Sequence, residues 1–267
     1  MLVALVNDQR TSAAPKLKGL CPGCLQPVTA RCGKQRAWHW AHDSKRECDS
    51  WWEETEWHRM WKSHFPVEWQ EVILHDVQLN EKHIADIRTK HGLVMEFQHS
   101  PLDPQECRKR ESFYKNMVWI VDASHQKNDF KRFVKGFSRF LKTNRQGMFR
   151  VLFPDETFPA NWIQNTKPVF FDFRGLIPTD PSDPHDKLRE LLWCLLPGRV
   201  ERQAVVIAFS RGDIVTEATE HSDLLEVLLK GSVEVHNFLL QLRQRTTSSL
   251  LPLPPHSYYG QRRRRRF

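Results

Sequence analysis

The chain has 267 residues, which is enough for one large domain or two modest ones with a sizeable buried core. Hydrophobic residues make up 40% of it and charged residues 27%, and no apolar run approaches the ~20 residues that cross a bilayer, a pattern that predicts a soluble, globular protein. The apolar start at residues 1–6 is too short and too uncharged for a signal peptide, so we expect a cytoplasmic protein without a membrane partner.

The net charge of +8 is concentrated at one end of the chain. Residues 262–266 are five consecutive arginines, so the other residues together carry a net charge of only +3. Such a run attracts phosphates whatever their sequence and weakly favours a nucleic-acid partner, but an ordinary solvated tail explains it equally well. With three prolines just before the arginines, residues 249–267 are predicted to be a disordered tail.

Residues 1–50 form the first predicted domain and contain four of the six cysteines. Cys21 and Cys24, followed by His39 and His42, give the spacing C-x2-C-x14-H-x2-H. Two thiolates and two imidazoles suit tetrahedral Zn²⁺, and a segment with so few apolar residues needs a bound metal ion to fold. We therefore predict a structural zinc knuckle held by these four residues.

Two alternatives to this ligand set stay open. Cys32 and Cys48 lie in the same segment and are substitute ligands. Without a metal, the cysteines and histidines would be ordinary surface residues, with His39 packed between the neighbouring tryptophans.

Residues 51–145 are predicted to form the central domain. Tryptophans 57 and 61 at helical spacing predict a first helix over residues 51–65, with Ser50 as its cap and Pro66 as its end. Three strands in an antiparallel meander, a second helix and a buried strand follow, at residues 67–74, 83–89, 93–98, 104–116 and 117–121.

Residues 146–248 are predicted to be a C-terminal α/β extension, in which no chemistry is evident. Strands are expected at 149–153, 169–173 and 204–209, and amphipathic helices at 224–229 and 233–242. If the protein forms a homodimer or recruits a protein partner, we expect it to do so through this extension.

Asp86 and Glu96 stand on neighbouring predicted strands that a short turn separates. Strand alternation puts Glu96 and Gln98 on one face, where a polar pair is costly to bury without a partner or a function. Two adjacent carboxylates favour a cation. Mg²⁺ or Mn²⁺, held by Asp86, Glu96 and the carbonyl of Phe97, could activate water and neutralise charge developing on a phosphodiester.

The first predicted helix offers further candidates for the same site. Glu54, His58 and Lys62 are spaced by four residues and therefore share one helix face. An exposed face with salt bridges along it would show the same spacing, so the pattern alone does not separate a functional face from a solvated one.

The second predicted helix carries Arg108, Arg110 and Tyr114. Arginine is suited to gripping a phosphate, and tyrosine offers either a hydrogen bond or a face on which a base can stack. These residues are candidates for DNA binding, and solvated surface charge is the alternative for the two arginines.

In their order and spacing, these motifs resemble the competence-protein CoiA-like family. The resemblance covers roughly residues 18–125, including the knuckle, and rests on residues 54–58 with Lys62, 83–87, 96–100, Arg110, Tyr114 and 119–121. It implies the PD-(D/E)XK nuclease superfamily. The fold class expected from it is α/β (α+β), with a restriction-endonuclease-like core of mixed β-sheet flanked by helices.

The resemblance also implies roles for particular residues. Catalytic roles fall on the metal ligands Asp86 and Glu96, on Gln98, and on the first-helix residues Glu54 (or Glu56) and His58. Gln98 stands where many members of the superfamily have lysine, and glutamine offers no charge to a transition state. Lys62 or an arginine of the second helix is the candidate to replace that lysine.

The leading hypothesis is a metal-dependent nuclease that hydrolyses phosphodiester bonds in DNA, with Mg²⁺ or Mn²⁺ at its active site and a structural zinc ion. The resemblance implies a place in bacterial DNA processing, recombination or defence. The alternative is a non-catalytic nucleic-acid-binding protein with a degenerate nuclease fold, in which Gln98 marks the lost activity. A third hypothesis makes the core a scaffold and residues 146–245 the binding site of a protein partner.

Overall fold

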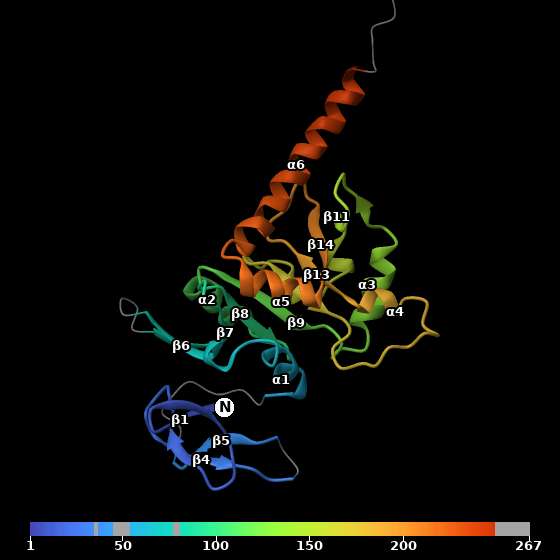
Figure 1. The fold of residues 1–267 in the computed structure, drawn as a ribbon. Helices are drawn as coiled ribbons and strands as arrows, with labels where there is room; N and C mark the ends of the chain where they lie inside the picture. The colour runs from blue at the N-terminus through green and yellow to red at the C-terminus, as the bar shows by residue number, and fades with distance from the viewer. Residues whose placement is uncertain (35–36, 45–53, 77–80, 249–267) are drawn as a thin grey trace, which may run out of the picture.

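The computed structural model of the chain describes residues 1–34, 37–44, 54–76 and 81–248 (Figure 1). Three predictions lie outside the described residues: the helix cap at Ser50, the alternative ligand Cys48 and the disordered tail at 249–267.

The N-terminal domain is a small sheet of five antiparallel strands in the order β2-β1-β3-β4-β5. The strands are β1 Val3–Val6, β2 Gln9–Ser12, β3 Lys18–Leu20, β4 Pro27–Arg31 and β5 His39–His42. Asn7 and Asp8 join β1 to β2 with φ angles of 51° and 62°, the left-handed conformation of a tight hairpin turn. Strands of three to five residues are too short to show a sustained alternation, which is why the sequence did not predict them.

The rest of the described chain is built on one mixed sheet of nine strands, in the order β10-β11-β14-β13-β12-β9-β8-β7-β6. Its strands are β6 Gln70–Asp76, β7 Glu81–Arg88, β8 Val94–Gln98, β9 Met117–Asp122, β10 Leu141–Lys142, β11 Met148–Val151, β12 Val169–Asp172, β13 Leu191–Leu195 and β14 Ala204–Ser210. The predicted meander is confirmed, because β6, β7 and β8 are successive antiparallel neighbours, whereas β8, β9 and β12 run parallel. The mixed α+β class with a large mixed sheet is confirmed as well.

This sheet draws its strands from both the predicted central domain and the predicted C-terminal extension. Alternate residues of β9 face opposite ways: Val118 and Ile120 belong to one hydrophobic cluster, and Trp119 and Val121 to the other. Each face of the sheet therefore has its own core, and helices cover both faces.

The helices are α1 Glu56–Lys62, α2 Pro104–Phe113, α3 Asp129–Phe137, α4 Asp186–Arg189, α5 Arg211–Glu220 and α6 Leu224–Ser248. Residues of α1, α5 and α6 belong to the first hydrophobic cluster, and residues of α2 and α3 to the second. Short 3-10 turns lie at Val67–Trp69, Pro154–Glu156 and Ala160–Trp162. No helix in the described part of the chain combines the length and the apolar character needed to cross a membrane.

The helices differ from the predicted ones in bounds and number: α2 ends at Phe113 rather than at 116, and α3, α4 and α5 were not predicted. In the described residues α1 begins only at Glu56, because the side chain of Thr55 caps it. The helices expected at 224–229 and 233–242 are one continuous helix, α6, which extends away from the sheet (Figure 1). Gly231 does not break α6. A Cβ atom there would lie 3.1 Å from the side chain of Leu196, so the glycine allows the helix to pack closely on the core.

Candidate functional site

The helix α1 is fixed to the large sheet by hydrogen bonds to one buried carboxylate. Trp57 and Trp61 donate from Nε1 to Oδ2 of Asp172 at 2.9 and 3.1 Å, and Arg211 donates to the same carboxylate at 2.6 and 2.7 Å. Asp172 is fully buried at the end of β12. Because the tryptophan face of α1 is held in this way, the adjoining face with His58 and Lys62 is directed toward β7 and β8.

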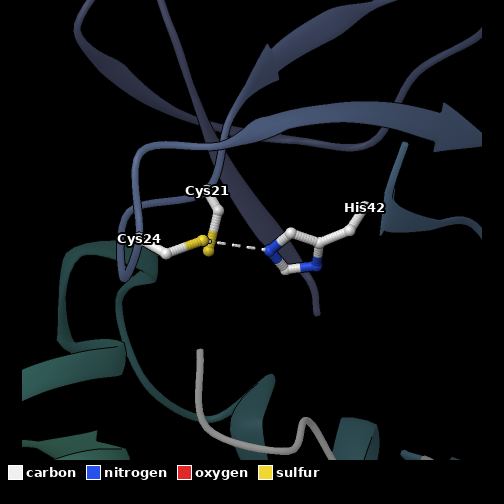
Figure 2. A group of neighbouring side chains, drawn as sticks. All are labelled: Cys21, Cys24 and His42. Carbon is white, nitrogen blue, oxygen red and sulfur yellow. Dashed lines mark hydrogen bonds between the residues drawn. The ribbon is translucent and has the colours of Figure 1, made fainter. Parts of the chain in front are cut away.

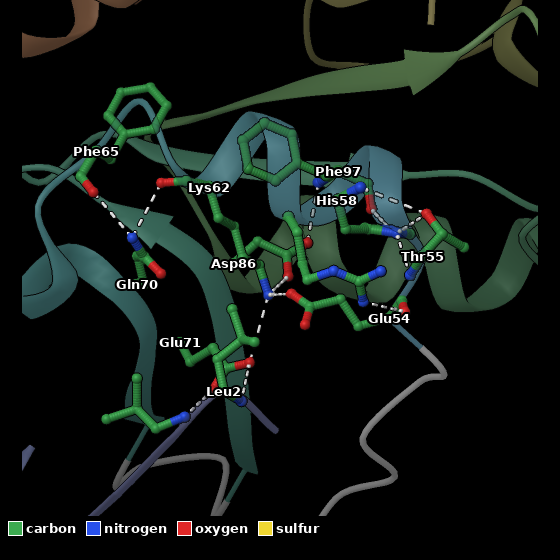
Figure 3. A network of polar contacts seen from close by, with 12 residues as sticks. Leu2, Glu54, Thr55, His58, Lys62, Phe65, Gln70, Glu71, Asp86 and Phe97 are labelled. Atoms are coloured by element: carbon green, nitrogen blue, oxygen red, sulfur yellow. Dashed lines mark hydrogen bonds and ion pairs between the residues drawn. The ribbon is translucent and has the colours of Figure 1, made fainter. Parts of the chain in front are cut away.

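Lys62 lies among three carboxylates (Figure 3). Its Nζ is 3.0 Å from Oδ1 of Asp86, 3.1 Å from Oε1 of Glu54 and 3.4 Å from Oε1 of Glu71. Burial opposes the charge on Lys62, but the three carboxylates together raise the pKa of its ammonium group. The structure thus brings together Glu54, Lys62 and Asp86, which were predicted as site residues, and adds Glu71.

Asp86 and His58 hold the same segment of β8 from two directions. Oδ2 of Asp86 accepts a hydrogen bond from the Phe97 amide at 3.0 Å, and His58 Nε2 lies 3.0 Å from the Phe97 carbonyl oxygen. His58 Nδ1 accepts from the backbone amide of Thr55, so the proton resides on Nε2 and His58 donates to Phe97. Burial opposes the ionisation of Asp86, but Lys62, His58 and the Phe97 amide keep its pKa below the usual value.

Glu96 is buried on β8, and its two carboxylate oxygens have different surroundings. Oε2 accepts a hydrogen bond of 2.6 Å from Arg110, which also binds Glu106, whereas Oε1 is buried without a hydrogen-bond partner among the described residues. Burial raises the pKa of Glu96 to about 7; Arg110 opposes this shift, and the charge of Asp86 adds to it.

Asp86 and Glu96 are residues that could offer oxygen atoms to a hard divalent cation, although both oxygens of Asp86 already contact Lys62 or the Phe97 amide. A buried carboxylate oxygen without a donor is costly, and a second carboxylate near enough to repel it makes that cost larger. Oxygen ligands from Glu96 and Asp86 are of the kind that Mg²⁺ and Mn²⁺ prefer. Arg110 neutralises only one side of Glu96.

Three predicted residues lie apart from this cluster. The side chain of Gln98 donates to the carbonyl oxygen of Ser100 at 2.6 Å, and Arg108 is exposed on α2. Tyr114 is only 3% exposed, with its ring against Phe113 and His83, so its face does not lie at the surface for stacking on a base.

Not predicted from the sequence were Glu71, Asp172 and the pair formed by His99 and Asp122, whose Nδ1 and Oδ2 atoms are 2.7 Å apart. For the two aspartates a signal was available, an acid at the end of an apolar strand, whereas Glu71 follows Gln70 at the polar start of β6. Asp172 follows two phenylalanines in this way, and Asp122 ends the apolar strand β9.

A second cluster lies in the N-terminal domain, where Cys21, Cys24 and His42 meet (Figure 2). One ligand atom from each lies within 4.8 Å of the others, and Cys24 Sγ is 3.3 Å from His42 Nε2. Leu25, with φ of 56°, donates from its amide to the Cys21 carbonyl oxygen and closes the turn that brings the two sulfur atoms together. Two thiols and an imidazole form a group that could hold zinc.

His39 is not part of this group, although it was predicted as the fourth ligand. Both histidines lie on β5, and a spacing of three residues places them on opposite faces of a strand. His39 Nδ1 instead lies 2.8 Å from the carbonyl oxygen of Ala37. The alternative ligand Cys32 is also outside the group.

Comparison with known proteins gives one match. Residues 7–50 match the family described as "Competence protein CoiA, N-terminal domain", and they include the cysteine and histidine ligands of the cluster above. No curated protein and no solved structure matches the chain. This match supports the resemblance of the N-terminal domain to the competence-protein CoiA-like family.

Proposed function

We propose that this protein is a metal-dependent nuclease that hydrolyses phosphodiester bonds in DNA, in bacterial DNA processing, recombination or defence. The observation that carries the proposal is the meeting of Asp86, Glu96 and Lys62, with one buried oxygen of Glu96 left without a donor. In this proposal the mixed sheet with its β7–β8 hairpin is a restriction-endonuclease-like core of the PD-(D/E)XK superfamily.

Asp86 and Glu96 would hold the Mg²⁺ or Mn²⁺ ion. When bound, such an ion activates a water molecule and neutralises charge that develops on the phosphate. The chain contributes the placement of the two ligands. Asp86 and His58 hold the Phe97 peptide by its amide and its carbonyl, and this fixes the direction in which the neighbouring Glu96 side chain leaves the strand.

Lys62 supplies the positive charge that Gln98 lacks. Its buried ammonium group contacts Asp86 and Glu54, and the raised pKa keeps it protonated at neutral pH. A fixed ammonium group beside the metal ligands is suited to stabilising charge on a phosphate oxygen or to orienting the attacking water. The position of Lys62 on α1 therefore supports the hypothesis that the helix replaces the lysine expected on the strand.

We also propose that Cys21, Cys24 and His42 bind a structural zinc ion. Thiolate and imidazole ligands suit zinc, and the small core of the N-terminal domain leaves much of its stability to the metal. DNA is the partner proposed for the whole protein, with Arg108 on the exposed side of α2 as a phosphate contact.

The test is cleavage of plasmid and linear DNA in the presence of Mg²⁺ or Mn²⁺, with Asp86→Asn and Glu96→Gln proteins beside the wild type. Metal-dependent cutting that both substitutions abolish supports the proposal. Gln98 stands where many members of the superfamily have lysine, and this difference favours a second candidate, a nucleic-acid-binding protein without catalysis. Tight DNA binding by the wild type with no cutting in either metal would establish that candidate instead.

A further inference from the structure

Glu71 lies between the N-terminal domain and the proposed active site. Its carboxylate accepts hydrogen bonds from the backbone amides of Leu2, at 3.0 and 3.1 Å, and Val3, at 3.3 Å. Oε1 of the same carboxylate is 3.4 Å from Nζ of Lys62 (Figure 3). One buried side chain thus contacts the first strand of the small sheet and the lysine of the site.

The backbone at Glu71 is unusual. Its φ angle is 49°, a left-handed conformation that a residue with a Cβ atom adopts at an energetic cost. The register pairs Gln70 with Ile87 and Val72 with Ala85, so Glu71 stands across from Asp86. The strained conformation therefore occurs at the point of β6 that is nearest to the metal ligand on β7.

Further contacts hold the N-terminal domain to this edge of the large sheet. Arg10 on β2 donates to the carbonyl oxygens of Gln70 and Glu71. Lys82 on β7 donates to the carbonyl oxygen of Gly23, at 3.1 Å, inside the turn between the two cysteines. The small sheet is thus docked both at the start of β6 and through the proposed zinc knuckle.

We propose that Glu71 is a positioning residue through which the docked N-terminal domain holds Lys62 in the proposed active site. The inference rests on the proposed nuclease function for its catalytic consequence, but the coupling itself is a property of the structure. The N-terminal domain would then be required for cleavage although it contributes no group to the reaction.

The physical reason is that a buried carboxylate must keep its donors. With the amides of Leu2 and Val3 in place, Glu71 has most of its hydrogen-bonding capacity satisfied and meets Lys62 through one oxygen only. Without those amides, the carboxylate must turn toward Lys62 or toward water. Either movement changes the contacts by which the three carboxylates hold the ammonium group of Lys62.

The test compares Glu71→Gln and Arg10→Ala with the wild type. Glu71→Gln removes the charge facing Lys62 but keeps one oxygen for the backbone amides. Arg10→Ala loosens the docking contact without touching Lys62. Glu68→Gln is the matched control, because Glu68 is an exposed acid just before β6. If Arg10→Ala does not fold, Arg10→Lys takes its place.

Two measurements are made on each protein. The first is the rate at which an amine-reactive reagent modifies Lys62 without divalent metal, followed by peptide mass spectrometry. This rate is low in the wild type because the side chain is only 5% exposed. The second is the split between kcat and KM for DNA cleavage.

We expect the reagent to modify Lys62 about tenfold faster in both variants than in the wild type. We also expect kcat to be about tenfold lower and KM to stay within about twofold of the wild-type value, because Lys62 is misplaced while DNA binding is unchanged. Glu68→Gln should match the wild type in both. Unchanged modification of Lys62 in Arg10→Ala, together with faster amide hydrogen exchange at Leu2 and Val3, would overturn the coupling. Faster modification in proteins that never cut DNA would support the coupling and refute the nuclease.

Discussion

The small and large sheets of this protein are stabilised in different ways. The small sheet encloses a single minor cluster, formed by Met1, Ala4, Cys21, Val28 and Trp40. The large sheet has a wide hydrophobic cluster on each face, with helices packed against both. Burial alone can stabilise the large sheet, whereas in our proposal the small one also relies on zinc held by its cysteine and histidine cluster.

The difference matters because the proposed active site lies where the two regions meet. Asp86, Glu96 and Lys62 belong to the large sheet and α1, but Glu71 joins them to the backbone of β1. If the small sheet depends on zinc as we propose, a site that lies between it and the large sheet should respond differently to damage in each.

The largest effect should come from the proposed zinc ligands. His42→Ala is expected to release zinc and to unfold the N-terminal domain, because structural zinc contributes roughly 10–16 kcal/mol of apparent binding free energy in small zinc domains. His39→Ala should retain stoichiometric zinc, since His39 lies on the other face of β5. Metal analysis of freshly purified protein and a thermal unfolding scan provide the measurement.

The large sheet should remain folded in the His42→Ala protein, which would be seen as a separate, unchanged unfolding transition. Loss of zinc from His39→Ala to the same extent as from His42→Ala would restore the ligand set predicted from sequence. Wild-type protein purified without any zinc would contradict the proposal that zinc stabilises the small sheet.

A loss of catalysis without a loss of fold is expected from substitution of the proposed metal ligands on the large sheet. Asp86→Asn and Glu96→Gln should each lower cleavage by about a thousandfold, because metal activation of water and charge neutralisation depend on both ligands. Glu81→Gln is the matched control, since Glu81 is a partly exposed acid at the start of the same strand as Asp86. Initial rates on supercoiled plasmid with Mn²⁺ provide the measurement.

The zinc content of these variants should equal that of the wild type, because the two metal sites share no ligand. Cleavage that persists in both variants would place the reaction elsewhere in the molecule.

Asp172→Asn should mainly affect the stability of the large sheet. The carboxylate of Asp172 accepts hydrogen bonds from both tryptophans of α1 and from Arg211, and breaking one partner of a buried charge pair costs roughly 3–5 kcal/mol. Urea denaturation measures the change, and Asp155→Asn, an exposed acid, is the control. A variant as stable as the wild type would show that α1 is held by packing alone.

The sequence predicted most of the large sheet because its strands carry strong signals. The antiparallel meander and the buried strand β9 lie where the apolar runs and polar turns placed them. The acids of the site were found because Asp86 and Glu96 interrupt apolar strands. Glu71 was not found, since its role depends on the register of β6 and on contacts with β1, which lies far away in sequence.

The N-terminal domain was harder to predict from sequence for a physical reason. The cysteine pair was recognised from a short spacing that a tight turn enforces. The choice between His39 and His42 depends on whether the segment is a helix or a strand, because a spacing of three brings side chains together on a helix and separates them on a strand. No apolar alternation was available to decide this.

The smallest expected effect is a pH dependence of metal binding at the large sheet. Glu96 is an acid whose pKa is raised to about 7 by burial, so below that pH the folded protein holds it protonated and without charge. A metal ion must displace this proton, and the apparent affinity for Mn²⁺ should therefore rise about fivefold between pH 6 and pH 7 and about tenfold in all by pH 8, where it levels off. Calorimetric titration at several pH values measures it.

The free energy of unfolding should change with pH in the direction opposite to the affinity for Mn²⁺. Without metal, the folded state holds the Glu96 proton up to about pH 7, whereas the unfolded chain loses it near pH 4.5. The free energy of unfolding should therefore fall as the pH rises between these two values. Arg110→Gln should move the step in Mn²⁺ affinity to higher pH, because Arg110 opposes the raised pKa of Glu96. Glu81→Gln should leave it in place. A step unmoved by Arg110→Gln would mean that another group titrates, and the proposed role of Glu96 as a metal ligand would lose its electrostatic support.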